Sequence, residues 1–463
     1  MLKVVSLPKF KNEKKYILDV ILCEFLGLDY TLEFAANVTS TLFYGELGRI
    51  EMPDIFFSID ESQWLTESNM PKLPLRLTNI NFEGTEFIDL PVIFGSSNND
   101  DIYTHNDIYN VNLGIDVIGS AFFMLTRYEE YVLNQYRDLY DRFPVEQSLA
   151  FKYDFLDRPI INEYVELLWL ALKIISPGLK KRSRTFKVIP THDIDKPFGM
   201  AYDSKLQIIR HLIGDIVIRH SYKKLFARVI EICSMMFAHH AYIKERLETF
   251  DFFIEESKRH GLKDIFFFMN SKCSLYDGNY TVDHCDILEL IKKIIKEGHL
   301  IGLHPSYISY MDGQEIKNES VHMNKVLLEN GFSEMVGARQ HFLKWKNPDT
   351  WQHYEDAGIP FDSTMTYAGH VGFRSGICYP YPVYNIVERK ILNLIERPLI
   401  VMDGSLFDYM KLSNEEAMLV IKKLASKCKK YNGEFIFLWH NTMLDDIDKK
   451  SFYKNMLIEL CKY

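Results

Sequence analysis

The 463-residue sequence is short of several features that define specialised classes of protein. Its seven cysteines are scattered and include no Cys-x-x-Cys pair, which excludes a zinc-ribbon pattern and a disulfide framework and favours a reducing compartment. No apolar run approaches the roughly 18 residues of a membrane span. The N-terminus also lacks the compact apolar segment and small-residue cleavage site of a secretory signal. We therefore expect a cytoplasmic protein without a transmembrane segment.

Basic residues are fewer than acidic ones: 54 Lys and Arg against 63 Asp and Glu give a formal net charge of −9 at pH 7. This balance argues against nucleic acid as the main partner. No glycine-rich phosphate loop is visible either. The chain does have a globular composition, 47% hydrophobic and 25% charged, over a length for which two domains are the default.

The first 180 residues mix short strand-like and helix-like patterns, and we predict a smaller α+β domain over residues 1–180. Helices are expected over residues 15–28 and 161–175, and strands over residues 75–81 and 90–94. Asp116 is expected to cap a helix that runs through residues 122–133. The polar, basic stretch SPGLKKRSRT (176–185) is the predicted linker.

From residue 186 the sequence pattern changes, and strand-like apolar runs alternate with helical patterns. This alternation indicates a parallel β/α architecture, which we assign to a second domain over residues 186–463. The seven runs are FKVIP (186–190), DIFFFM (264–269), HLIGL (299–303), MVGARQHF (335–342), GIPFDST (358–364), RPLIVMD (397–403) and EFIFLWH (434–440).

A helical insertion, at about residues 197–258, separates the first two runs. Its basic residues stand among apolar ones, which is typical of a surface that touches anionic lipid or polysaccharide, although a solvated face is the commoner reason for such charges. A peripheral membrane contact is therefore one open hypothesis. The residues concerned are Arg210, His211, Arg219, His220, Lys223, Lys224 and Arg228.

Nearly every run ends in a polar residue. In a β/α barrel the site is built at the C-terminal ends of the strands, whereas local caps would not need to be His, Arg and Asp so often. The pattern therefore favours one site over seven separate turns. The residues are Asp193, Asp195, Asn270, His304, Arg339, His341, Asp362, Asp403 and His440.

The first of these ends carries the most informative motif, Thr191-His192-Asp193-Ile194-Asp195. On an extended segment, the side chains of residues i and i+2 point to the same side, so the carboxylates of Asp193 and Asp195 should lie close together. Because like charges at short distance repel, such a pair needs a metal cation or a shared proton. An Asx-turn is the structural alternative for such a pair.

A hydrolytic metal site needs ligands, a proton acceptor and a proton donor. Asp195 and His304 are candidate ligands, and Asp193 is the candidate acceptor of a proton from water. His440 is the candidate donor to the leaving group, and Arg339 would pair with Asp193 and keep it ionised. A turn at His304, a core histidine at His440 and a structural ion pair at Arg339 are the alternatives.

The segments THDID, GHLIGLHPS, GARQHF and LWH, in that order, resemble the polysaccharide deacetylase family (carbohydrate esterase family 4, or NodB-like), over residues 186–463. The resemblance implies a distorted (β/α)7 barrel that removes acetyl groups from N-acetylated sugars, usually with zinc. It also implies that Asp193 is the catalytic base, Asp195 and His304 are metal ligands, Arg339 orients the base and His440 is the catalytic acid. Asp403 lies where the variable fourth motif of the family is expected.

The N-terminal half, through FFMLTRYEEYV and DRFPVEQSLAFKYDFLDRPIINEYVELL, resembles the accessory domain of a bacterial subgroup of these barrels. That subgroup is associated with the biosynthesis of cell-surface polysaccharide. The resemblance implies no activity for the accessory domain itself.

The chain departs from the family pattern at the metal ligands. Ile308 stands four residues after His304, where the family has its second histidine. Strand alternation places His341 on the same side as Arg339, so we hypothesise that His341 completes the metal shell. Tyr307 and His192 are weaker candidates for that position.

Candidate substrate-binding residues follow from the same strand ends. Asp362 and Arg374, in a polar loop over residues 361–376, either line a sugar pocket or pair with each other. The full set of candidates is Tyr307, Asp362, Arg374, Asp403 and Trp439.

The leading hypothesis is a metal-dependent hydrolase that deacetylates an N-acetylated sugar of a glycan or of its precursor, with zinc as the expected metal. A non-catalytic barrel that binds glycans, as the missing second histidine would allow, is the first alternative. A glycosyltransferase that holds a metal-bound nucleotide sugar on Asp193 and Asp195 is the second, although the absent phosphate loop disfavours it.

Overall fold

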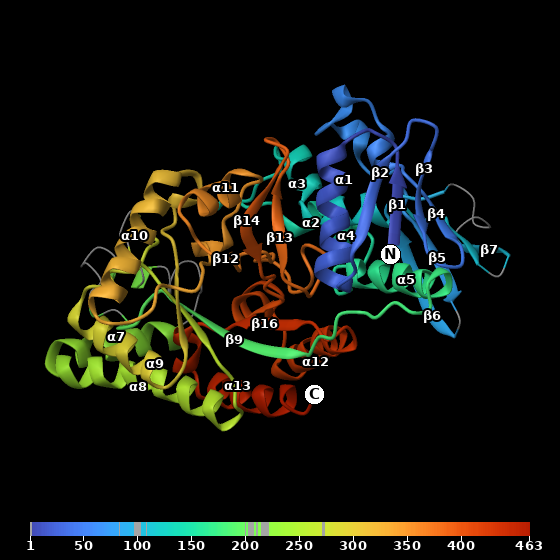
Figure 1. The fold of residues 1–463 in the computed structure, drawn as a ribbon. Coiled ribbons are helices and arrows are strands. Elements are labelled where there is room, and N and C mark those ends of the chain that lie inside the picture. The colour runs from blue at the N-terminus through green and yellow to red at the C-terminus, as the bar shows by residue number, and fades with distance from the viewer. Residues whose placement is uncertain are drawn as a thin grey trace.

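Two sheet-containing regions lie side by side in the computed structural model (Figure 1). The structure describes residues 2–82, 84–96, 103–107, 109–199, 201, 208–209, 212–213, 222–270 and 274–463. The N-terminal elements, blue to cyan, surround one sheet, and the elements from β9 (Lys187–Ile194) onward, green to red, build the other. The chain is therefore of mixed α/β class.

The N-terminal sheet has the strand order β2-β1-β3-β4-β8-β7, and β5 and β6 form a separate antiparallel hairpin. The pairs β1–β2 and β4–β8 are parallel, and the other pairs in the sheet are antiparallel. The strands of this region are β1 (Leu2–Ser6), β2 (Tyr30–Phe34), β3 (Ser40–Tyr44), β4 (Arg49–Pro53), β5 (Arg76–Phe82), β6 (Thr85–Val92), β7 (Tyr103–Asp107) and β8 (Asn110–Leu113). Its α-helices are α1 (Lys11–Leu18), α2 (Val117–Leu125), α3 (Tyr128–Val132), α4 (Leu149–Lys152) and α5 (Ile160–Ile175).

Most local predictions for this region are confirmed. The helix expected over residues 15–28 is present as α1 and a π-helical continuation, η1 (Asp19–Leu26). Asp116 does cap α2, because its carboxylate accepts the Gly119 N–H at 2.7 Å. The single helix predicted through residues 122–133 is wrong, since Arg127 takes a φ of 52° and divides it into α2 and α3. That turn lets the Arg127 guanidinium pair with the buried Glu129 and Glu130.

The C-terminal sheet has five parallel strands in the order β11-β10-β9-β16-β15. Their bounds are β10 (Ile265–Phe268), β11 (Leu300–Leu303), β15 (Val401–Met402) and β16 (Glu434–Leu438), together with β9. Beyond β11, single bridges from Leu303 to Ala338 and from Ala338 to Asp362 continue the parallel order to β12 (Phe361–Asp362). The run over residues 335–342 is therefore a bridge rather than the strand that its apolar pattern predicted, because it turns at once into η8 (His341–Leu343).

An antiparallel hairpin of β13 (Tyr381–Asn385) and β14 (Lys390–Glu396), which the sequence did not predict, joins β12 through β14. In Figure 1 this hairpin lies between α1 and the rest of the C-terminal region. No pairing among the described residues joins β15 to these strands, so the closed seven-stranded barrel stays a prediction.

Helices follow the strands of the second region and cover its sheet. They are α7 (Tyr222–Phe237), α8 (His239–Arg259), α9 (Cys285–Lys296), α10 (Gly313–Glu329), α11 (Asp349–Asp356), α12 (Asn414–Lys430) and α13 (Ile447–Leu460). In α9, for example, Ile287, Leu290, Ile291 and Ile294 recur at helical spacing and are the buried face. Within the described part of the chain, none of the helices has both the length and the apolar character to cross a bilayer.

The predicted helical insertion contains α7 and all but the last residue of α8. Arg210, His211, Arg219 and His220 lie outside the described residues, as do the side chains of Lys223 and Lys224. The hypothesis of a basic surface on this insertion therefore stays a prediction.

A buried ionic network joins the two regions. Glu130 of α3 accepts hydrogen bonds from Nε of Arg127 and from Nε of Arg374, both at 2.9 Å. Arg127 Nη2 also donates to the Tyr367 hydroxyl at 3.0 Å. Because a buried charge is costly when it has no partner, these contacts fix the loop over residues 361–376 against α3.

Candidate metal centre

The C-terminal ends of β9, β11, β15 and β16 meet at one cavity of about 320 Å³. Eight Arg, Asp and His side chains line it. Six were predicted from the sequence to carry chemistry or bind substrate; the other two are Asp408 and Arg142, and Arg142 comes from the N-terminal region. They are Arg142, Asp193, Asp195, His304, His341, Asp403, Asp408 and His440.

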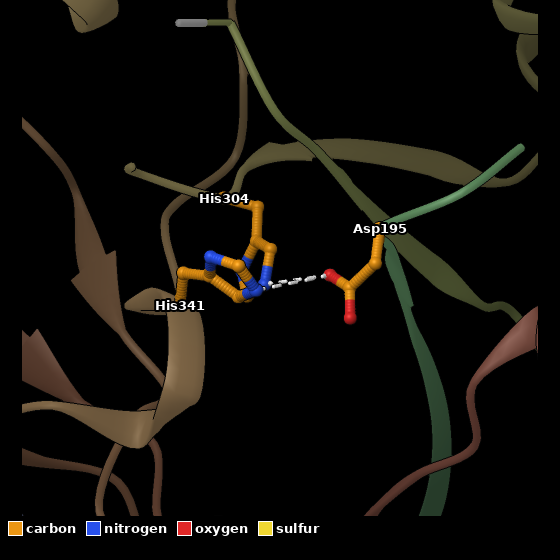
Figure 2. A group of neighbouring side chains, drawn as sticks. All are labelled: Asp195, His304 and His341. Atoms are coloured by element: carbon orange, nitrogen blue, oxygen red, sulfur yellow. Dashed lines mark ion pairs between the residues drawn. The ribbon is translucent and has the colours of Figure 1, made fainter. Parts of the chain in front are cut away.

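Asp195, His304 and His341 form a compact group in which one ligand atom from each residue lies within 4.8 Å of the others. Figure 2 shows the two imidazole rings facing one carboxylate. Asp195 Oδ1 lies 3.3 Å from His304 Nε2 and 3.7 Å from His341 Nε2. The structure thus brings together the three residues that the sequence proposed as ligands.

Hydrogen bonds on the far sides of the rings select the neutral tautomer of both histidines, in which Nδ1 carries the hydrogen. His304 Nδ1 lies 2.6 Å from the carbonyl oxygen of Arg339, and since a carbonyl only accepts, Nδ1 carries the proton. His341 Nδ1 lies 3.2 Å from Oδ1 of the buried Asp277, which also accepts the Tyr307 N–H. In the neutral rings, each Nε2 is therefore left with a lone pair directed at the centre, as a metal ligand requires.

The donor set fits a divalent cation. Asp195 Oδ1 is a buried carboxylate oxygen that accepts no hydrogen bond from the described residues. Although burial alone would raise the pKa of Asp195, His341, His304 and His440 hold it well below its usual range. Two imidazole nitrogens and one carboxylate oxygen are ligands that catalytic zinc commonly has, with a position left for water or substrate.

Ile308, the fourth residue after His304, does not belong to this group. It is 48% exposed at the start of a 3-10 turn and does not line the cavity. His341 reaches the centre from η8, where Phe342 and Leu343 both have positive φ values, 61° and 55°.

Asp193 and Arg339 form the pair that the sequence predicted. Arg339 Nη1 donates to Asp193 Oδ1 at 3.0 Å and to the Thr191 hydroxyl at 2.7 Å, while Nε donates to the Ser363 carbonyl at 2.9 Å. Arg339 is fully buried, so its position is fixed by four groups around it, counting its bond to the Ser363 hydroxyl. This arrangement holds Asp193 at the edge of the cavity, with Oδ2 3.8 Å from His304 Nε2.

His440 and Asp403 form a second pair. Asp403 accepts from the backbone N–H of His440 at 2.6 Å, and its Oδ1 lies 2.7 Å from His440 Nδ1. Burial alone would lower the pKa of His440, but Asp403, followed by Asp195 and Asp193, raises it to about 10. The imidazole is therefore a cation at neutral pH, with Nε2 3.9 Å from Asp195 Oδ2.

Three of the candidate substrate residues lie elsewhere. Trp439 is fully buried and stacks on Phe452 at 5.8 Å, because alternation along the chain turns it away from the side that His440 faces. Asp362 is buried under Trp351, whose Nε1 donates to it at 3.2 Å. Arg374 pairs with Glu130 and lines a smaller adjoining cavity of about 160 Å³ rather than this one. The proposed pairing of Asp362 with Arg374 is therefore wrong.

Of the remaining candidates, Tyr307 stacks on Tyr276 at 4.5 Å, outside the group that lines the cavity. His192 points to the other side of β9, where its Nε2 lies 3.2 Å from Asp264, so it cannot be a ligand.

Two functional contacts were missed from the sequence. Asp277 stands in an irregular loop, 64 residues before His341, and no spacing connects the two. Asp403 was expected to bind substrate from its place at a strand end and at the variable fourth motif, but its carboxylate is bound to His440, and neither signal predicted that partner.

Comparison with known proteins gives partial matches. A family model described as a family of unknown function (DUF7033) matches residues 3–177, and no curated protein matches the sequence. Among solved structures, the chain is similar to a candidate polysaccharide deacetylase from Mycobacterium smegmatis, with a TM-score of 0.40 and 14% identity over 60% of this chain and 85% of that one. It is also similar to a family 4 carbohydrate esterase from Streptomyces lividans in complex with acetate, with a TM-score of 0.28 and 8% identity over 46% of this chain and 80% of that one.

Proposed function

We propose that this protein is a metal-dependent hydrolase that removes the acetyl group from an N-acetylated sugar of a polysaccharide or of its precursor. The observation that carries the proposal is the group of Asp195, His304 and His341. It shares one cavity with two paired side chains, Asp193, which Arg339 holds, and His440, which Asp403 holds. Ligands, acceptor and donor are the three parts that hydrolysis of an amide requires.

Asp195, His304 and His341 would hold the cation, which supplies Lewis-acid polarisation of the acetyl carbonyl and a lowered pKa for water. Zinc is the expected ion for this donor set. Asp193, kept in place by Arg339, accepts the proton from water as the oxygen–carbon bond forms. His440 donates a proton to the amine nitrogen as the carbon–nitrogen bond breaks, while Asp403 holds its other nitrogen. The products are acetate and the free amino sugar.

The alternative is a non-catalytic glycan-binding protein, and no feature of the cavity favours it. Binding alone would not require a cationic imidazole held by a buried carboxylate beside the candidate metal ligands. The family's missing second histidine, which was the reason for this alternative, is offset by His341.

The test is acetate release from a panel of N-acetylated oligosaccharides by the zinc-loaded full chain. Asp193→Asn and His440→Ala should each lower release by about 100-fold or more, since a general acid or base typically contributes about 100- to 10,000-fold. His322→Ala is the matched control, because this half-buried histidine bonds Asn270 and does not line the cavity. Unchanged release in either of the first two variants would refute the proposed roles.

A further inference from the structure

The cavity of the candidate metal centre has one wall that belongs to the N-terminal region. Arg142 lies 50 residues or more before every other charged residue that lines the cavity, and it is only 9% exposed. A second cavity of about 160 Å³ adjoins the first, and Arg142, Leu343, Ala368 and Tyr409 line both. The space beside the metal centre therefore continues along Arg142.

The Arg142 guanidinium is held by partners from three segments. Nε donates to Asp138 Oδ2 at 2.8 Å, and Nη2 lies 2.7 Å from the same carboxylate. Nη2 also donates to the Tyr409 hydroxyl at 3.2 Å, and Nη1 donates to the Phe342 carbonyl at 3.3 Å. Since arginine has five N–H groups, these contacts leave one Nη1 hydrogen for a ligand.

Charge indicates what kind of ligand this is. Asp138 already neutralises Arg142, and the carboxylates of Asp193, Asp195, Asp403 and Asp408 line the same cavity. The Arg142 guanidinium therefore keeps no net charge for an anionic ligand, whereas a sugar hydroxyl can accept from the arginine and donate to a carboxylate. The wall therefore suits a neutral saccharide.

Aromatic rings complete the wall. The Arg142 Cζ lies 4.9 Å from the ring centre of Tyr140 and 5.7 Å from that of Tyr409, which is 46% exposed. Tyr140 in turn contacts Phe342 with ring centres 5.2 Å apart. Rings with a polar rim offer an apolar face to the C–H face of a pyranose and hydrogen-bonding groups to its edge, which is a common composition for small-molecule sites.

The backbone under this wall is strained at the point where it meets the metal centre. Phe342 and Leu343 are consecutive non-glycine residues with positive φ, and they directly follow His341. Such strain persists only where surrounding contacts enforce it and gathers at functional sites. Here the bond from Arg142 to the Phe342 carbonyl is one of those contacts.

We propose that Arg142, Tyr409 and Phe342 form a second saccharide subsite beside the metal centre, with Tyr140 packed against Arg142 and Phe342, so that the ligand is a neutral oligosaccharide of at least two sugars. The N-terminal region then supplies part of the binding site for the substrate. The inference rests on the proposed function for the position of the first sugar, but it concerns binding and not hydrolysis.

The test is calorimetric titration of the metal-free full chain, which excludes turnover, with N-acetylglucosamine and with its linear β-1,4 tetramer. The wild type should bind the tetramer at least tenfold more tightly than the monomer. Tyr409→Ala, and Arg142→Lys, which keeps the charge but loses the planar fork, should each remove most of that preference and leave monomer affinity unchanged. Tyr136→Ala, at a 42% exposed tyrosine that does not line either cavity, is the control and should change neither affinity.

Equal affinity of the wild type for the two probes would overturn the subsite, as would equal losses for both probes in the variants. Failure of both probes to bind would also overturn it. A parallel measurement of zinc binding distinguishes rejection of the subsite from rejection of the proposed function. If one zinc ion binds per chain and no saccharide binds, the subsite is rejected while the metal centre stands.

Discussion

Replacement of Asp277 by Asn should weaken metal binding without a change at any ligand. Asp277 accepts from His341 Nδ1 at 3.2 Å and from the Ser274 and Tyr307 backbone amides at 2.7 Å each. An Asn side chain has only one oxygen, so its NH₂ group must face either the Ser274 amide or the pair formed by Tyr307 and His341. In the second arrangement His341 Nδ1 has to accept, its proton moves to Nε2, and the lone pair that faces Asp195 is lost.

The expected loss of zinc affinity is about 10- to 100-fold, the usual effect of a lost outer partner of a histidine ligand. That range corresponds to about 1.4–2.8 kcal/mol of binding free energy. The assay is competition for zinc against a chelator of known affinity, with wild type and Asp277→Asn at one pH. Asp283→Asn, an exposed carboxylate of the same loop, is the matched control and should bind zinc as the wild type does.

Thermal unfolding of the metal-free proteins shows whether the substitution disturbs the fold rather than the ligand. If Asp277→Asn binds zinc with wild-type affinity while its fold is intact, then His341 does not depend on Asp277 and the assigned tautomer is wrong. If the fold is lost, Asp277→Glu provides a charged variant for the same comparison.

Three further outcomes follow from the ionisable groups. Asp403→Asn removes the main group that raises the pKa of His440, so the proton-donating form should be lost at lower pH, and the basic limb of the kcat/KM profile should move toward acid. Burial, and then Asp362, raises the pKa of Glu396 well above its usual range, so this group lowers stability by up to about 1.4 kcal/mol per pH unit as the pH rises above its unfolded pKa. Glu396→Gln should make the fall in unfolding free energy in urea between pH 5 and 8 shallower by that amount, while the buried Glu319 and Asp116, whose pKa values are also raised, keep the rest of the slope. Glu130→Gln leaves Arg127 and Arg374 without their shared partner and should cost about 3–5 kcal/mol in the same assay, whereas Glu329→Gln, in an exposed pair with Lys325, should cost at most about 1 kcal/mol. A pH slope as steep in Glu396→Gln as in the wild type, or equal costs for the two glutamate changes, would contradict the assignments.

Local rules were enough to predict the side chains that end the parallel strands. Asp193 and Asp195 share a side because they are two residues apart, and His304 and His440 join them because parallel strands present their C-terminal ends together. The same alternation argues against Trp439 and His192 as site residues, since each is the direct neighbour of a residue that faces the cavity.

Contacts between distant segments could not be read from the sequence. Arg374 pairs with Glu130 across 244 residues, and His341 pairs with Asp277 across 64, so no spacing rule connects them. The positive φ of Arg127 breaks a pattern that is helical in propensity, because burial of its charge between two glutamates outweighs the local preference for a continuous helix. Tertiary electrostatics, rather than residue propensity, decided each of these features.

The metal content of the purified full chain, measured by elemental mass spectrometry after zinc is offered, tests the central claim most directly. We predict about one zinc ion per chain in the wild type and in His322→Ala, and loss of that ion in Asp195→Ala, His304→Ala and His341→Ala. Absence of metal in the wild type, or retention of a full equivalent in His341→Ala, would contradict it.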